Sequence, residues 1–357
     1  MYLDHQARDA RAGLSLFAGR SLPSRLFDVA GSLGLRVGGW AYRSVIADPD
    51  EHGEWNIQRL RRLGRTVQEA ASAAQISMLV PCDPGWPAGT GCDELPCLWV
   101  RGNTDVAGLL GAAVAVTGTD TPSDDGLAMA AGLATDLVHA GWTIVTSTDA
   151  GIDQHVTATV LHLPDAVPLL VTGGGLDPAS SPTIAAILPP ILTRGAVISM
   201  APPGARPWRA RVRARNELLH RLGAASVLVE AGARSRHLRP ARGAARSGRL
   251  VCAELGPAAA ATSQGCRKLL RDGAAHPVTG AQQVLEAIGN HGIGLSTLRG
   301  MAHTGPDRDT GALDAFPAAE TQAIDVVVEP HELPARRDLS VSDPAGGCDD
   351  IADNLAA

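Results

Sequence analysis

Three glycine-containing segments follow apolar stretches of the chain, and each could present backbone N–H groups to a phosphate. The first contains Gly118 and Thr119, the second Ser147 and Gly151, and the third Gly174 within three consecutive glycines. Glycine lets a ligand approach the main chain closely, and a helix that begins at such a loop attracts anions. None of the segments matches G-x-G-x-x-G or a Walker loop, so ordinary strand-to-helix turns are the alternative.

A basic segment from Arg194 to Arg249 holds thirteen arginines and only two acidic residues. Guanidinium groups present a planar fork to phosphate oxygens, and so large an excess predicts a nucleic-acid surface. The residues expected to contact DNA here are Arg209, Arg211, Arg215, Asn216 and Arg242, with the single lysine, Lys268, as a further contact. Arg239, Arg242 and Arg246 have the spacing of one helix face. The alternative is a solvated basic face in a sequence that uses Arg almost to the exclusion of Lys.

No arrangement typical of catalysis or metal binding occurs in the sequence. G-x-S-x-G, H-E-x-x-H and C-x-x-C are all absent. Asp124 and Asp125 are adjacent at the predicted start of a helix, where acidic side chains stabilise the helix end rather than act as a catalytic pair. Asp153 is likewise explained as a residue that caps the start of a helix. We therefore expect a protein that is not an enzyme, binds no metal or cofactor and keeps its cysteines reduced.

The elements that must position these residues follow a regular pattern. Apolar strands alternate with helices over residues 104–289, which is typical of an α/β fold with a doubly wound, Rossmann-like parallel sheet. Ligands of such sheets bind outside the carboxyl ends of the strands. Residues 1–77 read as a small helical module, and residues 78–103 as a connector with two short strands. The basic run is expected to lead into a helix from Ala214 to Leu222.

The charge of the chain is unevenly distributed. The formal net charge is −6, yet residues 301–357 alone contain twelve acidic residues and three arginines. Residues 290–357 therefore form an acidic tail, which either aids solubility or covers the basic surface as a nucleic-acid mimic. The polar N-terminus and the lack of a long apolar run predict a cytoplasmic protein that does not bind membranes.

A set of further segments resembles the DNA-processing protein A (DprA/Smf) family, in a divergent, actinobacterial-like form. The resemblance covers about residues 10–290, and its order and spacing are more specific than any one piece. The matching segments are DPGWP, ELPCLWVRGN, VAVTGTD, AGID, LLVTGGGLDP, APPGARP, ARNELL, VLVEA, ARGAARSGR and GCRKLLRDGAAHPVT.

The resemblance implies a particular function. Family members have a helical N-terminal module and a Rossmann-like core that binds single-stranded DNA. They act as homodimers in natural transformation, help to load a RecA-type recombinase, and have no established catalytic reaction. Many also carry a winged-helix module, of which residues 311–333 resemble only the beginning.

The sequence departs from the family at several positions of the implied phosphate pocket. Asp120 follows Gly118 and Thr119 where the family usually has Arg, and Asp149 lies in a shortened segment that also lacks an Arg. Thr157 replaces a His, and Glu217 replaces the second Arg of Arg-Asn-Arg. These changes leave open whether the pocket still holds a phosphate.

Two other functions are therefore kept as alternatives. One is a degenerate family member that binds a protein partner and no DNA. The other is a nucleotide-binding or phosphoribohydrolase-like Rossmann protein, in which Asp120, Asp153 or Glu230 would assist cleavage of a glycosidic bond.

Overall fold

The computed structural model describes residues 5–18, 22–23, 26–33, 35, 45–46, 56–90, 92–178 and 182–291. The N-terminal module consists of α1 (His5–Ser15), β1 (Leu22–Pro23), α2 (Phe27–Ser32), β2 (Val45–Ile46) and α3 (Ile57–Ala73). The acidic tail and the winged-helix resemblance lie outside the described residues, except for the end of the last helix.

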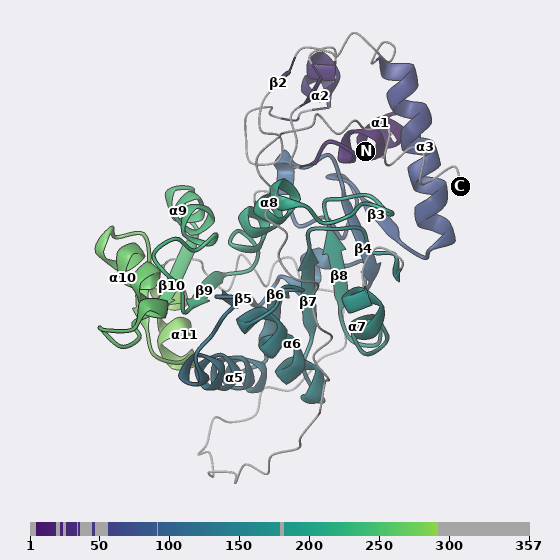
Figure 1. Cartoon of the computed structure of the whole chain (residues 1–357). Helices are drawn as coiled ribbons and strands as arrows, with labels where there is room; N and C mark the ends of the chain where they lie inside the picture. The colour runs from purple at the N-terminus through teal and green to yellow at the C-terminus, as the bar shows by residue number, and fades with distance from the viewer. Residues whose placement is uncertain are drawn as a thin grey trace, which may run out of the picture.

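A nine-stranded sheet in the order β11-β10-β9-β5-β6-β7-β8-β4-β3 forms the centre of the molecule (Figure 1). Strands β5 to β11 are parallel, whereas β4 runs antiparallel to β8 and β3 antiparallel to β4. The strands are β3 (Ser77–Leu79), β4 (Leu98–Gly102), β5 (Ala113–Gly118), β6 (Thr143–Ser147), β7 (Pro168–Thr172), β8 (Ala196–Ser199), β9 (Ala225–Val229), β10 (Leu250–Glu254) and β11 (His276–Val278).

Helices cover both faces of the sheet. They are α4 (Val106–Leu109), α5 (Asp124–His139), α6 (Ile152–His162), α7 (Pro182–Leu192), α8 (Arg209–Leu219), α9 (Leu238–Arg246), α10 (Gln264–Arg271) and α11 (Ala281–Asn290), with short 3-10 turns η2 (Cys92–Glu94) and η4 (Ala261–Ser263). Successive side chains of β9 show the two layers: Val227 and Val229 pack with α5, α6 and α11, whereas Leu228 packs with α9 and α10. This alternation follows from the two-residue period of a strand.

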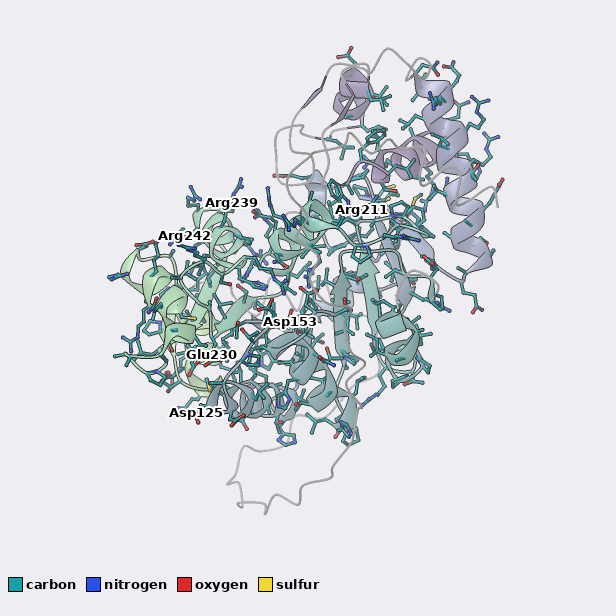
Figure 2. The ribbon with its side chains drawn as sticks, viewed as in Figure 1. Asp125, Asp153, Arg211, Glu230, Arg239 and Arg242 are labelled. Carbon is teal, nitrogen blue, oxygen red and sulfur yellow. The ribbon has the colours of Figure 1, made fainter. Side chains whose placement is uncertain are left out.

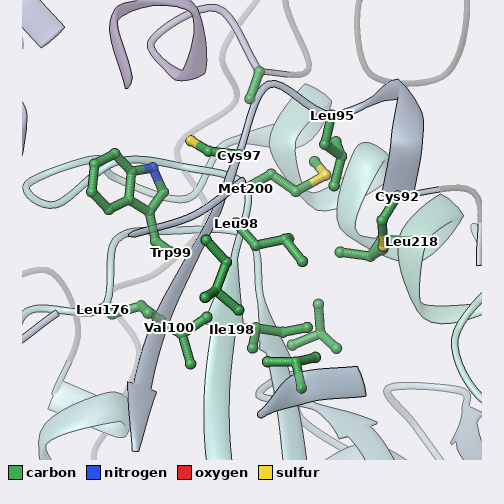
Figure 3. Packing of buried hydrophobic residues seen from close by; sticks show 14 of the residues in the cluster. Cys92, Leu95, Cys97, Leu98, Trp99, Val100, Leu176, Ile198, Met200 and Leu218 are labelled. Atoms are coloured by element: carbon green, nitrogen blue, oxygen red, sulfur yellow. The ribbon is translucent and has the colours of Figure 1, made fainter. Parts of the chain in front are cut away.

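The N-terminal module shares a hydrophobic core with the sheet. Leu14 of α1 and Leu60 of α3 are buried in the same cluster as β4 and β8, and Figure 3 shows the part of this cluster around Trp99. The indole Nε1 of Trp99 donates to Ser15 Oγ at 3.2 Å. Helices α1 and α3 can cross closely because residue 64 is glycine. A Cβ at this position would lie 1.8 Å from the Asp9 carbonyl oxygen.

The predicted α/β fold, with its doubly wound, Rossmann-like sheet and helical N-terminal part, is confirmed. Two details differ from expectation. The two connector strands join the main sheet as an antiparallel edge, and α8 begins at Arg209 rather than at Ala214. The first turn of α8 was not predicted because its arginines show no apolar periodicity, although Arg and Ala are both good helix formers. No helix within the described part of the chain is long and apolar enough to cross a membrane.

Candidate functional site

The strand order reverses direction between β5 and β9, which are neighbours in the sheet. Gly118 at the end of β5 is in register with Val229 at the end of β9. From β5 the chain proceeds to β6, β7 and β8 on one side, whereas β9 leads to β10 and β11 on the other. In doubly wound proteins such a point, outside the carboxyl ends of the strands, is where ligands bind.

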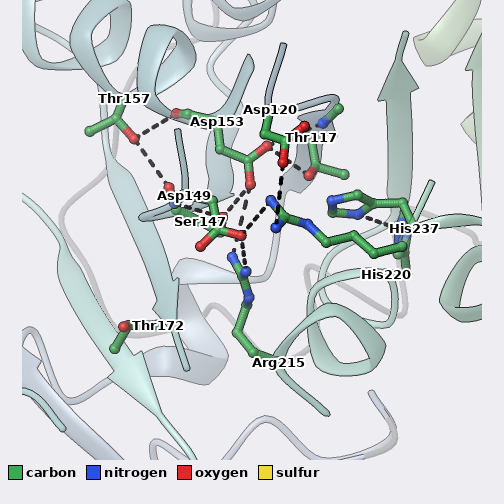
Figure 4. A network of polar contacts seen from close by, with 12 residues as sticks. Thr117, Asp120, Ser147, Asp149, Asp153, Thr157, Thr172, Arg215, His220 and His237 are labelled. Carbon is green, nitrogen blue, oxygen red and sulfur yellow. Dashed lines mark hydrogen bonds and ion pairs between the residues drawn. The ribbon is translucent and has the colours of Figure 1, made fainter. Parts of the chain in front are cut away.

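Asp153, at the start of α6, joins the ends of β5 and β6 (Figure 4). Its Oδ1 accepts from Thr117 Oγ1 at 2.7 Å and from the Gly118 N–H at 3.1 Å. Its Oδ2 accepts a hydrogen bond from Ser147 Oγ. Burial raises the pKa of Asp153, and the nearby Arg215 opposes that rise. Asp153 therefore organises the sheet edge from within and is not presented to a ligand.

Arg215 of α8 supplies the counter-charge at this edge. It is 0% exposed and forms ion pairs with Asp149 and, at 3.9 Å, with Asp153. Arg236 approaches from the chain that follows β9, at 2.8 Å from Asp149 and 3.9 Å from Asp120. Asp149 and Asp120 are therefore paired with arginines that come from distant parts of the chain. Figure 4 shows Asp149 beside Arg215.

The N-terminus of α5 is already occupied by a carboxylate. Glu230 Oε2 accepts from the Ser123 N–H at 2.9 Å, and Oε1 accepts from Ser123 Oγ at 2.6 Å and Thr262 Oγ1 at 2.8 Å. Glu230 adopts a φ of +52°, which is uncommon for a residue with a side chain. An anion is favoured at a helix N-terminus, and here Glu230 provides it. A phosphate beside Gly118 would meet this carboxylate.

The glycines predicted to approach a phosphate lie against other parts of the chain. A Cβ on Gly151, whose φ is +82°, would lie 2.3 Å from the Thr119 carbonyl oxygen. A Cβ on Gly174 would lie 3.0 Å from Pro207, because the segment before α8 packs on it. These contacts account for the glycines structurally, and their phosphate contacts stay predictions.

A buried histidine pair lies behind Arg215. His220 ends α8, and its Nδ1 is 3.0 Å from Ser226 Oγ, while its Nε2 is 3.4 Å from Nδ1 of His237. Burial and, to a smaller extent, the positive charge of Arg215 lower the pKa of His220 to about 3. Burial likewise lowers the pKa of His237, with His220, Arg215 and Arg236 adding to the effect. Both rings are therefore neutral at pH 7. Sequence reasoning missed this pair because the residues meet only through the packing of α8, β9 and α9.

The residues chosen from the basic run divide into buried and exposed groups. Arg211 is 3% exposed and donates to the Arg206 carbonyl at 3.0 Å and to the Leu16 carbonyl at 3.5 Å, which ties α8 to the N-terminal module. Asn216 is fully buried, and neither of its amide atoms has a hydrogen-bond partner within the described residues. Arg209 is exposed. A DNA contact remains a prediction for each of them.

Helices α8 and α9 pack together and carry arginines on their outer surface. Glu217 lies between the helices, and burial raises its pKa while four arginines lower it. We call these residues the Glu217 arginine cluster: Arg213, Arg221, Arg239 and Arg246. All but Arg221 are exposed. Glu217 Oε2 lies 3.2 Å from the Cβ position of Gly243 in α9, so its negative charge is placed where the two helices meet. The exposed Arg213, Arg239 and Arg246 make this surface basic.

Arg242 and Lys268 extend the basic surface toward α10. Arg242 Nη2 pairs with Asp272 at 2.7 Å, so part of its charge is neutralised within the chain. Lys268 is exposed on α10. Figure 2 shows Arg239 and Arg242 together on α9, on the other side of the sheet from Asp125 of α5. A DNA contact of Arg242 or Lys268 stays a prediction.

Within the described residues no group of three or more His, Cys, Asp or Glu side chains could hold a metal ion. The fold and the site together define a doubly wound α/β protein with a self-neutralised switch point and a basic surface over α8 and α9.

Comparison with known proteins identifies the family. The model of the DNA recombination-mediator protein A family matches residues 77–289, from β3 to the end of α11. A DNA processing protein DprA of Mycobacterium tuberculosis is 31% identical in a match that covers 86% of this chain and 86% of that protein. Protein Smf of Synechocystis is 29% identical over 49% of this chain and 44% of its own length. The chain belongs to the DNA recombination-mediator protein A (DprA/Smf) family.

Two solved structures share the fold. DprA of Streptococcus pneumoniae superposes with a TM-score of 0.59 and 22% identity, over 80% of this chain and 98% of that one. DprA of Helicobacter pylori, whose structure was described for its single-stranded-DNA-binding mode, gives a TM-score of 0.52 and 22% identity over 61% and 98%.

Proposed function

We propose that this protein binds single-stranded DNA as a DprA-type DNA processing protein. The observation that carries the proposal is the exposure of Arg213, Arg239 and Arg246 on the packed helices α8 and α9. The carboxylate of Glu217 lies beside Gly243 of α9, where the two helices meet. Family membership and the DNA-binding mode described for the Helicobacter pylori relative support it.

The strand is proposed to lie on the α8–α9 surface rather than at the switch point. Asp120, Asp149 and Glu230 surround the switch point, and their negative charges would repel a phosphate. Arg215 and Arg236 could not offset this repulsion, because they are already paired with the aspartates. The exposed Arg213, Arg239 and Arg246 have Glu217 as the carboxylate near them, so a phosphate would meet less negative charge there. Backbone neutralisation supplies affinity with little sequence preference and a steep dependence on salt.

The buried arginines have a supporting role in this proposal. Arg215 fixes the end of the sheet, and Arg211 fixes α8 against the N-terminal module. Both keep α8 in place, so that the exposed arginines of the same helix face the strand. Only three per cent of the chain is aromatic, so phosphate contacts are expected to outweigh base stacking.

The remaining family properties belong to the same proposal. They are homodimer formation, loading of a RecA-type recombinase during DNA uptake, a cytoplasmic location and the absence of a catalysed reaction. Two of the three carboxylates named for glycosidic cleavage support this last point, because Asp153 and Glu230 are engaged by neighbouring hydroxyl and N–H groups.

The test is binding of a labelled dT oligonucleotide and of a matched duplex at several salt concentrations. We expect a preference for the single strand and a steep loss of affinity with salt. The double variant Arg213→Ala/Arg239→Ala should bind more weakly and lower the salt slope by about 0.7 for each phosphate that it no longer neutralises. The matched control removes Arg61 and Arg62 of α3, which lies far from α9 (Figure 1).

Equal weakening in the control would show that only overall charge matters. Absence of oligonucleotide binding at low salt would overturn the proposal and favour the degenerate, partner-binding alternative.

A further inference from the structure

Three arginines of the Glu217 arginine cluster place positive charge on the surface of α8 and α9. Arg239 and Arg246 are exposed on α9, and Arg213 is exposed on α8. The one carboxylate among them, Glu217, is 9% exposed and cannot turn outward to pair with each. Concentrated like charges repel one another unless an anionic partner lies over them.

The described chain ends beside this surface. His291, which follows α11, has its Nε2 3.2 Å from the Gly248 carbonyl oxygen. Gly248 lies two residues beyond Arg246, the last residue of α9. The chain that continues from His291 therefore starts at the edge of the arginine cluster.

The sequence beyond that point is complementary in charge. Residues 301–357 contain twelve acidic residues and three arginines, a net charge of −9. Residues 292–300 are enough to span about 30 Å when extended. The carboxylates of residues 301–357 can therefore reach any part of the cluster from the tether at His291.

We propose that the acidic segment 301–357 binds the Glu217 arginine cluster of its own chain and competes there with single-stranded DNA. The competition rests on the proposed function, whereas the contact between segment and cluster does not. A tethered segment has an effective concentration on the order of 1 mM, so even weak binding in trans becomes significant in cis. DNA displaces the segment because its phosphates are more closely spaced and release condensed counterions.

The first experiment keeps the chain at full length and replaces every Asp and Glu of residues 301–357 by Asn and Gln. At low salt this variant should bind a dT oligonucleotide about tenfold more tightly than the parent, and the difference should vanish at high salt. Neutralisation also changes the overall charge, so the comparison is repeated in an Arg239→Ala/Arg246→Ala background and in an Arg61→Ala/Arg62→Ala background. The gain should shrink in the first and persist in the second.

The second experiment measures the contact without DNA. A labelled peptide of residues 301–357 is added to the neutralised full-length protein, and its binding is followed by fluorescence anisotropy. Binding that weakens with salt and is abolished in the Arg239→Ala/Arg246→Ala background supports the contact. This result would support the contact even if no oligonucleotide bound to the protein. Failure to bind an oligonucleotide would overturn the proposed function but not the contact.

An oligonucleotide affinity that does not change on neutralisation overturns the competition. A peptide that fails to bind, or binds equally well without Arg239 and Arg246, overturns the contact.

Discussion

Arg213 and Arg215 lie two residues apart on α8, yet the first is exposed and the second is completely buried. The helical period separates them, because residues two apart point to different sides of a helix. Arg215 faces Asp149 and Asp153, so its positive charge is part of the interior. A substitution at each position therefore tests a different property of the protein.

Arg215→Ala should lower the free energy of unfolding by about 3–5 kcal/mol, because removing one partner leaves a buried charge uncompensated. Arg213→Ala should change it by less than about 0.5 kcal/mol, as is usual for an exposed site. Urea denaturation followed by circular dichroism measures both. Equal stability of the two variants would contradict the assigned role of Arg215.

The buried histidine pair makes stability depend on pH. Since the pKa of His220 falls from its usual 6.5 to about 3 on folding, the unfolded chain binds more protons between these values. The free energy of unfolding should therefore decrease as the pH falls below 6.5, by about 2 kcal/mol for His220 between pH 7.5 and 5. His237, whose pKa is also lowered, adds in the same direction.

The variant His220→Asn keeps a polar atom near Ser226 and cannot be protonated. Its loss of stability between pH 7.5 and 5, measured by urea denaturation, should be smaller than that of the parent. Parallel pH profiles for the two proteins would exclude His220 as a source of the dependence.

At the scale of elements, the junction between β5 and β9 sets the geometry of the site. Gly118 lies in this junction, and a Cβ there would be 2.0 Å from the Val229 carbonyl oxygen and 2.6 Å from Ile152 Cγ1. Ile152 begins α6, so the glycine allows a strand and a helix to meet at the switch point. The need for glycine here is one of packing within the fold.

Gly118→Ala should destabilise the protein by about 1–3 kcal/mol, as overpacking of an interior usually does. Gly132→Ala is the matched control, because Gly132 lies in α5 with open space around its Cβ position. That change should stabilise by about 0.5–1 kcal/mol through helix propensity. Thermal unfolding distinguishes the two, and a neutral Gly118→Ala would refute the packing argument.

At the scale of the whole molecule, the N-terminal module and the sheet share one hydrophobic cluster. Arg11 of α1 reinforces the connection by donating to the Pro96 carbonyl at 2.9 Å and to the Leu33 carbonyl at 2.6 Å. Parts that share a core unfold together, because neither can open without exposing the other's apolar surface.

Urea unfolding should therefore give coincident transitions by tryptophan fluorescence and by far-ultraviolet circular dichroism. Arg11→Ala should shift both midpoints down together, since it leaves buried carbonyl groups without a donor at a cost of about 1–3 kcal/mol. Arg62→Ala on exposed α3 surface serves as the control. A separate early transition would show that the module unfolds alone.

The sequence by itself determined the α/β class, the strand ends that form the site edge and the family, because strand and turn patterns are local. It also located the basic helices, since net charge over a segment needs no structure. Only the tertiary structure decided that Arg211 and Arg215 are buried, that Asp149 pairs with Arg236, and that Glu230 binds Ser123, the N-cap of α5. Those partners are distant along the chain, and which of them meet depends on how the layers pack, which no local pattern specifies.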